Sequence, residues 1–431
     1  MTTFSRAIGL PAATALVVGT IIGSSIFVQA SEIALLVPHR GAILLAWAVA
    51  GVLTLIGALV CAELSSAYPK TGGVYVFLKE IYSPSLGFLW GWAMLWTMHS
   101  GILAAIATVF ARYAGVFVPL NDVTTRAVAI TAIVVLSVIN YLGVKFGSRV
   151  QTAFTLVKVL AVVTIIAVGF LFYQGAAPAV ETEVVKQSIG LGNFFLAVGA
   201  GLFAYGGWHM VTYTAEETLN PTRTIPRSLM IGVAVVTLCY IGLNLVYTLN
   251  LPMRAVMSST RIAADTFEVL LGPRAAGAIS ALVMLSAFGA LNGIVMVGPR
   301  VYYQMSQDGL WFKWASHLHP AFHTPGRAII LQAVVASVLV ATGSYRALFT
   351  RVIYTEWIFF ALLAFGVILL RRRPGYAPAW RMPLVPIAPL LFVIVSLLIV
   401  VNQIRADLAN SAIGLAIVAS GIPAYYFWNR K

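Results

Sequence analysis

The chain of 431 residues is 60% hydrophobic and only 9% charged, and its mean hydropathy is +0.94. Such a chain cannot cover its surface with polar groups, which excludes a water-soluble globular protein and predicts an integral membrane protein. The formal net charge of +14 comes from basic residues spread along short loops rather than gathered in one domain. Membrane topology therefore explains the charge better than a nucleic-acid partner does.

The first apolar segment begins near Gly9 and is long enough for a membrane helix, which needs about 20 residues. It has no basic leader and no small-residue cleavage site, which favours a retained helix over a signal peptide. Its stretch GTIIGSSIFV, residues 19–28, places Gly23, Ser24 and Ser25 near mid-membrane. Unpaired backbone groups are costly in hydrocarbon, so a broken helix there lines a cavity or meets a ligand. A small-residue patch for close helix packing is the alternative.

Apolar runs of about 20 residues predict about twelve membrane helices joined mostly by short loops. They begin near residues 9, 41, 85, 125, 149, 190, 228, 274, 326, 350, 383 and 410. The longest external stretches are 174–189 and 252–273. The distribution of Lys and Arg, above all the three arginines at 371–373, places both termini in the cytoplasm. We expect a single, multi-pass domain in the cell membrane.

The sixth span contains a second interruption, GLFAYGGWHM at residues 201–210. Gly206 and Gly207 lie near mid-membrane, where Gly costs about 1 kcal/mol relative to Ala in a helix. Interruptions in the first and sixth spans indicate an inverted repeat of two five-helix units with a binding site between the broken helices. Free N–H groups at one half-helix suit an anion, and free carbonyls at another suit a cation. An α-amino acid carries both charges close together and fits such a site.

Four stretches of the chain resemble the amino acid/polyamine/organocation (APC) superfamily, closest to its L-type amino acid transporter (LAT) branch. They are GTIIGSSIFV (19–28), AELSSAYPKTGGVYVFLKEIY (62–82), GLFAYGGWHMVTYTAEETLNPTRTIPR (201–227) and SAFGALNGIVMVGPRVYYQMSQDG (286–309). The resemblance implies a LeuT-type all-α fold with alternating access, moving small amino acids, often by exchange. It places a first five-helix repeat at about 9–173, a second, inverted repeat at about 190–371, and two further helices at 383–428.

The resemblance also implies a substrate site. The substrate carboxylate would meet backbone N–H groups, and hydroxyls, at Gly23, Ser24 and Ser25. The substrate ammonium would be held by the carbonyls of Ile21, Phe203 and Gly206. Phe203 also matches the aromatic gate of the family, which closes over the bound ligand; a core aromatic is the alternative.

Two residues depart from the family pattern. Ser25 stands where Gly is usual, and because Gly permits closer backbone approach, Ser25 narrows the pocket. His209 stands where the closest relatives often have a polar amide. Its imidazole either contacts the ligand or titrates, or it is a neutral histidine that donates to a neighbouring carbonyl. Both departures affect the identity of the substrate more than the mechanism.

Lys158 lies about 13 to 14 Å along the fifth span, at 1.5 Å per residue. A charge at that depth costs at least about 2.5–3.5 kcal/mol, so the ammonium must find oxygen partners or lose its proton. In relatives a lysine here takes the place of a sodium ion, which implies carbonyls near Gly19 or Ile22 and the hydroxyl of Ser286 as neighbours. Sodium coupling is then disfavoured. The remaining alternatives are exchange with a charged Lys158, proton symport through Lys158, and a lysine that only joins helices.

Three acidic residues, Glu63, Glu216 and Glu217, lie near the expected cytoplasmic ends of the second and sixth spans. They form either an inner gate of salt bridges or solvated helix ends. The basic residues close to them in sequence are Lys70, Arg223 and Arg227. His99 and Glu356 are further polar residues within spans, and each is a weak functional candidate.

No catalytic or phosphate-binding motif is present, so the sequence predicts no enzyme, no cofactor and no metal site. The histidines of HLHPAFH (317–323) lie in a predicted loop without acids or cysteines nearby, which favours loop packing over metal binding. Cys61 and Cys239 lie inside apolar spans, and residues 114–126 lack the cysteine that joins animal relatives to a heavy chain. We therefore expect no disulfide-linked partner.

The sequence as a whole predicts a sodium-independent transporter of small or medium neutral α-amino acids that works by exchange. A proton-coupled amino acid symporter is the first alternative. An amino acid sensor built on the same fold is the second. The expected partners are the amino acid substrate and the lipid bilayer, without nucleic acid.

Overall fold

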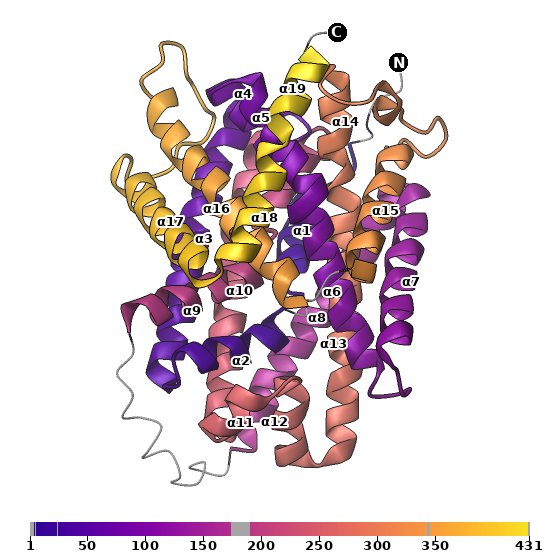
Figure 1. The fold of residues 1–431 in the computed structure, drawn as a ribbon, viewed down its shortest axis with the longest axis vertical. Helices are drawn as coiled ribbons and strands as arrows, with labels where there is room; N and C mark the ends of the chain where they lie inside the picture. The colour runs from indigo at the N-terminus through magenta and orange to yellow at the C-terminus, as the bar shows by residue number, and fades with distance from the viewer. Residues whose placement is uncertain (1–3, 5, 24, 174–189, 343–344, 430–431) are drawn as a thin grey trace.

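The computed structural model describes residues 4, 6–23, 25–173, 190–342 and 345–429. Across these residues the regular structure is helical, and the only β-type pairing is an isolated one between Ile8 and Thr218. The helices stand side by side in a bundle, with both chain termini at one end (Figure 1). Ser24 and the predicted external stretch 174–189 lie outside the described residues.

The helices follow one another along the chain with short connections. In order they are α1 (Leu10–Ile21), α2 (Ile26–Leu36), α3 (Arg40–Ala67), α4 (Val74–Ile81), α5 (Pro84–Ala93), η1 (Met94–Met98), α6 (His99–Ala114), α7 (Asp122–Tyr141), α8 (Val144–Leu171), α9 (Leu191–Ala204), η4 (Trp208–Glu217), α10 (Pro221–Asn250), α11 (Met253–Ser258), α12 (Ile262–Leu271), α13 (Pro273–Val297), α14 (Pro299–Gln307), η5 (Lys313–Ser316), α15 (Gly326–Thr342), α16 (Tyr345–Leu370), α17 (Ile387–Ala406), α18 (Leu408–Ala419) and α19 (Gly421–Asn429).

Nine helical segments of the described chain are long and apolar enough to cross a membrane, and the bent pair of α1 and α2 adds a tenth. Two shorter apolar helices, α15 and the Tyr354–Leu370 part of α16, bring the total of nine, one and two to twelve. Each of the twelve begins within a few residues of a start predicted from hydropathy, the largest difference being in α10. The prediction of an all-α membrane protein is confirmed.

Two of the twelve segments are broken at the predicted places. The axes of α1 and α2 meet at 46°, and α9 gives way to the 3₁₀-helix η4 after Gly207. α1 packs against η4, and α2 packs against α9. Because the first half of each segment contacts the second half of the other, the two broken segments lie antiparallel. The repeat boundaries at 9–173, 190–371 and 383–428 stay a prediction.

The helix α8 illustrates how the pattern of the sequence sets the packing. One face of α8 is buried, and residues at every third or fourth position lie on that face. These residues are Gln151, Thr155, Lys158, Val162 and Ile165. Leu156 and Leu160 on the opposite face are more than half exposed, which suits contact with lipid chains. A lysine on the inner face is therefore directed into the bundle.

The two ends of the bundle differ. Both chain termini lie at one end, and the short helices α11 and α12 lie at the opposite end (Figure 1). These two helices occupy most of the stretch 252–273, which the sequence predicted as a long external connection. At one side of the bundle, α7 and α15 pack together.

Candidate functional site

The first break begins where α1 ends at Ile21. The next residue, Ile22, has ψ of 87°, so its carbonyl leaves the helical direction. The Gly23 N–H donates to the Ile21 carbonyl at 2.8 Å, which closes a tight turn. α2 begins at Ile26 after Ser25, which makes no side-chain capping bond. The first N–H groups of α2 have no partner within the helix and lie at its positive end, as an anion site requires.

The second break is centred on Gly207, whose φ of +101° lies in the left-handed region. A Cβ atom there would lie 3.1 Å from the carbonyl oxygen of Thr20, so glycine is needed for the turn and for the approach of α1. The Thr20 hydroxyl lies 3.2 Å from the Gly207 carbonyl oxygen. The Gly206 N–H donates to the Phe203 carbonyl at 3.0 Å. The two breaks are therefore in direct contact.

A tyrosine that the sequence did not single out joins the two breaks. The hydroxyl of Tyr240, in α10, lies 2.9 Å from the Ile21 carbonyl oxygen and 2.9 Å from the Ala204 carbonyl oxygen. These are the last carbonyls of α1 and α9. A carbonyl oxygen has two lone pairs, so the Ile21 carbonyl can still accept from a ligand. Nothing local marks Tyr240, because it lies within an ordinary apolar span.

Lys158 binds the backbone of the first break. Its Nζ donates to the Gly19 and Ile22 carbonyls, at 2.8 Å each, and the residue is 2% exposed. These are the two carbonyls expected from the sequence. The expected contact with Ser286 is not formed, because the Ser286 hydroxyl is buried without a hydrogen-bond partner in the described part of the chain.

Two glycines make room for Lys158. A side chain on Gly19 would overlap the amide of Gln151 and the hydroxyl of Thr155, so Gly19 allows α8 to pack directly on α1. A Cβ atom on Gly289, in α13, would lie 3.3 Å from the lysine Nζ. The ammonium therefore occupies a space that α1, α8 and α13 enclose.

A buried carboxylate lies toward the end of the bundle that holds the termini. Glu63 is fully buried and binds Arg371 through two bonds, at 2.6 and 3.0 Å. It also accepts from the Met382 N–H at 2.8 Å and from the Tyr376 hydroxyl at 3.3 Å. Burial, together with the Glu63 carboxylate, raises the pKa of the Tyr376 phenol, so the phenol stays protonated and donates.

A second ion pair is buried more deeply. Glu217 binds Arg300 in a two-bond arrangement at 3.0 and 3.2 Å, and both side chains are 1% exposed or less. The Glu217 carbonyl accepts from the N–H groups of Ala7 and Ile8, at 2.9 and 3.0 Å. Glu217 therefore connects the N-terminal segment, η4 and α14.

These contacts correct the prediction of the inner gate. Glu63 and Glu217 are buried ion-pair members and not solvated helix ends, whereas Glu216 is exposed. The partners are arginines from α14 and from the end of α16. They are not the basic residues that the sequence places nearby, Lys70, Arg223 and Arg227. The pairing with distant arginines depends on the tertiary fold, which local sequence does not report.

Three polar side chains from different spans meet in the interior. They are His99 at the start of α6, His209 in η4, and Glu356 in α16, and one ligand atom of each lies within 4.8 Å of the other two. They are 0%, 0% and 3% exposed. No nitrogen of His209 has a hydrogen-bond partner among the described residues, so the alternative of a bond to a neighbouring carbonyl is not observed.

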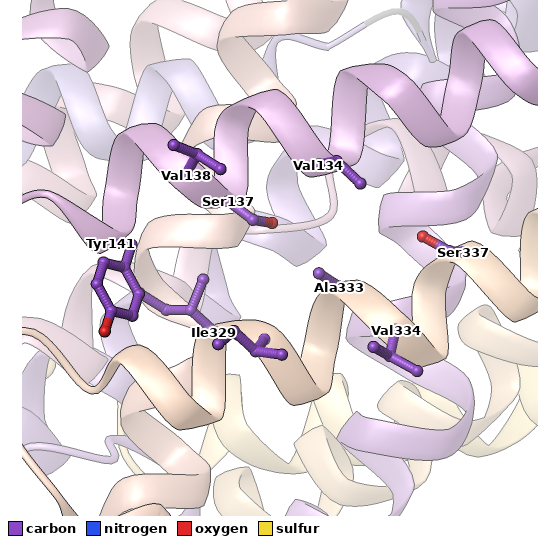
Figure 2. Close-up of a pocket in the computed structure, with 9 residues that line it drawn as sticks. Val134, Ser137, Val138, Tyr141, Ile329, Ala333, Val334 and Ser337 are labelled. Atoms are coloured by element: carbon purple, nitrogen blue, oxygen red, sulfur yellow. The ribbon is translucent and has the colours of Figure 1, made fainter.

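Two cavities lie away from the breaks. An apolar groove of about 430 Å³ runs between α7 and α15, lined by Val134, Val138 and Val334 among others (Figure 2). A second cleft, of about 570 Å³, separates the start of α1 from the start of α8 and is lined by Ala12 and Arg149 among others. Neither includes a predicted substrate residue. The described residues of that set are buried, apart from the half-buried Gly206.

The remaining candidates belong to packing. His319 lies against Phe322 and Tyr141, and its Nδ1 accepts from two backbone N–H groups. Cys61 and Cys239 are free thiols, and both are buried. The absence of a disulfide-linked partner stays a prediction.

The family model described as amino acid permease matches residues 8–422. The chain is 32% identical to the serine/threonine exchanger SteT of Bacillus subtilis over 430 residues, which cover 99% of this chain and 97% of that protein. It is 31% identical to the human b(0,+)-type amino acid transporter 1, over 94% of this chain and 83% of that protein. It is 29% identical to the human cystine/glutamate transporter, over 99% and 86%. The chain belongs to the amino acid permease family, within the APC superfamily and close to its LAT branch.

Proposed function

We propose that this chain is a sodium-independent transporter that moves α-amino acids by alternating access, exchanging one amino acid for another across the cell membrane. Membership of the amino acid permease family supports the substrate class. The printed name of one relative, a serine/threonine exchanger, supports both exchange and a small neutral substrate. Both termini would lie in the cytoplasm.

The two breaks supply the groups that an α-amino acid needs. The N-terminal end of α2, with Gly23, Ser24 and Ser25, would bind the substrate carboxylate. The carbonyls of Ile21, Phe203 and Gly206 would bind its ammonium. Because these contacts read only the backbone part of the substrate, they accept different side chains.

The observation that carries the proposal is the position of the Lys158 ammonium. It lies 2.8 Å from two carbonyls freed by the first break. A cation held there by the protein satisfies carbonyls that would otherwise attract an ion. A permanently charged Lys158 is then a fixed part of the site, and transport needs no sodium. A proton symporter would instead require Lys158 to release its proton during the cycle.

Gating involves both sides of the substrate site. Phe203, 7% exposed, would close the outer path over the ligand. The Glu63–Arg371 and Glu217–Arg300 pairs hold the end of the bundle that contains the termini. The cleft between the starts of α1 and α8 leaves room for α1 to move. Opening toward the cytoplasm would then separate α1 from its neighbours at that end.

The purified chain in proteoliposomes tests the exchange mechanism. The measurement is uptake of labelled serine without sodium, into vesicles preloaded with unlabelled serine and into empty vesicles at matched pH. Exchange requires uptake at least about tenfold faster into the preloaded vesicles. Equal uptake into empty vesicles that rises with an inward proton gradient would establish symport instead. Binding without flux in any format would establish a sensor.

A matched pair of variants tests the substrate site. Ser25→Leu places a large side chain in the buried break, and we expect exchange to be abolished while expression is retained. The control is Ser337→Leu, which lies in the groove between α7 and α15 (Figure 2) and should exchange normally. Normal exchange by Ser25→Leu would refute the assignment of the first break.

A further inference from the structure

The cluster of His99, His209 and Glu356 has no role in the proposed transport mechanism as far as Lys158 and the gates carry it. Its ligand atoms come from three separated parts of the chain and lie within 4.8 Å of one another. Each of the three residues is almost completely buried. Three polar side chains directed at one point of an apolar interior need an explanation, because each is expensive to bury.

Hydrogen bonding within the protein does not explain the cluster. Nδ1 and Nε2 of His99, Nδ1 and Nε2 of His209, and Oε1 of Glu356 are all buried without a hydrogen-bond partner among the described residues. An unsatisfied buried donor or acceptor costs about 1–3 kcal/mol. The other polar cluster of the interior, around Lys158, is fully hydrogen-bonded at its ammonium. The three residues are therefore arranged as the ligands of something else.

We propose that His99, His209 and Glu356 bind one divalent transition-metal ion of the zinc class. Two imidazoles and one carboxylate are a donor set that zinc uses in proteins. Imidazole also suits copper, nickel and iron, whereas magnesium and calcium prefer sites made of oxygen. A dication offsets the charge of the single carboxylate and accepts a lone pair from each ligand. Small side-chain movements bring ligand atoms at this separation to bonding distance.

The surroundings of the cluster suit a metal site. The imidazole of His209 is enclosed by the rings of Trp90, Trp208, Tyr213 and Phe360, with centroids 4.9–5.8 Å away. Such an apolar wall keeps water from competing for the ligands. The π-helical segment η1 ends directly before His99, and insertions of this kind are frequent at functional sites. The extra residue in the turn changes the direction in which the following side chain points.

A metal at this position would join three elements of the transporter. α6, η4 and α16 would be held together by bonds to one ion, and η4 is the second half of the broken sixth span. The site is separate from Lys158, which binds α1 from α8. Occupancy of the metal site would therefore restrain the sixth span while leaving the lysine contacts unchanged.

Zinc binding to the full-length, chelator-treated protein in detergent tests the proposal directly. Equilibrium dialysis followed by metal analysis should find one zinc ion per chain. His99→Gln and Glu356→Gln should each weaken binding at least about 100-fold, because each removes one of three ligands. The controls His317→Gln and Glu268→Gln change exposed residues and should bind zinc as the unmodified protein does. Undiminished binding by both His99→Gln and Glu356→Gln would overturn the proposal.

A spectroscopic measurement on the unmodified protein does not depend on the folding of variants. X-ray absorption of the zinc-loaded chain should show two imidazoles and further oxygen ligands, without sulfur. Retention of no zinc after dialysis would overturn the site, and so would a coordination shell with thiolate ligands or with more than two imidazoles.

Discussion

Two buried polar clusters occupy the interior of this bundle, and they differ in how their atoms are satisfied. The Lys158 ammonium donates to two backbone carbonyls that the first break has freed. The imidazoles of His99 and His209 lie beside a carboxylate, without a hydrogen bond to any described residue. The first cluster is complete as the protein stands, whereas the second needs a ligand. Burial alone therefore does not distinguish a structural polar group from a binding site; the count of satisfied atoms does.

The backbone explains the difference. A helix break frees carbonyls that a lysine can satisfy within the same chain. The histidine cluster lies where α6, η4 and α16 keep their regular bonds, so the backbone offers little to the side chains. We expect substitutions at the two clusters to have opposite effects on stability in metal-free protein.

The largest expected effect is that of Lys158→Met, which keeps the length of the side chain but removes the ammonium. Hydrogen bonds to charged groups contribute about 1.5–3 kcal/mol each, and two carbonyls would lose such a bond. We expect exchange in proteoliposomes to fall at least about 100-fold and the thermal midpoint in detergent to fall clearly. Lys313→Met, on exposed η5, is the control. Exchange at the normal rate by Lys158→Met would show that the lysine only fills space.

Gly207→Ala tests the contact between the two breaks. A left-handed backbone costs a non-glycine residue about 1–2 kcal/mol, and the new Cβ would press on Thr20. We expect a fall in stability of that size and about a tenfold loss of exchange. Gly277→Ala is the matched control, since its Cβ would meet nothing within 4 Å inside helix α13. It should gain about 1 kcal/mol from helix propensity. Equal effects of the two substitutions would remove the special role of Gly207.

Two tyrosines of α10 compare a satisfied and an unsatisfied hydroxyl directly. Tyr240 and Tyr247 are both fully buried, but the Tyr247 hydroxyl has no partner among the described residues. Tyr240→Phe should cost about 1 kcal/mol and slow exchange, because it disconnects the two breaks. Tyr247→Phe should be neutral or slightly stabilising. Thermal midpoints of the two variants give the comparison, and a larger loss in Tyr247→Phe would contradict it.

The smallest expected effect is that of His99→Leu in the presence of a chelator. Replacing an unsatisfied polar side chain by an apolar one should be neutral or stabilise the protein by about 1 kcal/mol or less. Asn140→Leu is the contrasting control, because its amide donates to Asn292 at 2.8 Å, and it should be destabilised. A clear loss of stability in His99→Leu without metal would show that the imidazole has a structural partner.

Hydropathy alone was sufficient to predict the membrane fold, because lipid requires long apolar helices and the chain supplies them. The two breaks were predicted for the same reason, since Gly23 and Gly207 stand where a continuous helix would be expected. The carbonyl partners of Lys158 came from the family resemblance rather than from the pattern of residues.

The remaining contacts join residues that are far apart in sequence. Arg371 lies 308 residues from Glu63, and Arg300 lies 83 residues from Glu217. Nothing near either glutamate indicates these partners. His99, His209 and Glu356 were noticed separately, but their meeting depends on how three spans pack. Intramembrane polar residues considered together, rather than one at a time, were the available signal.

The hydrogen bonds at Glu217 limit how the two broken segments can move. The segment that leads into α1 donates to the Glu217 carbonyl through Ala7 and Ile8, and the Leu219 N–H donates back to Ile8 at 2.9 Å. A displacement of α1 therefore carries the end of η4 with it unless these bonds break. Coupled in this way, the two segments have one degree of freedom instead of two. Partly opened states, through which solutes would leak, are then costly, and this suits a carrier that must never form a continuous pore.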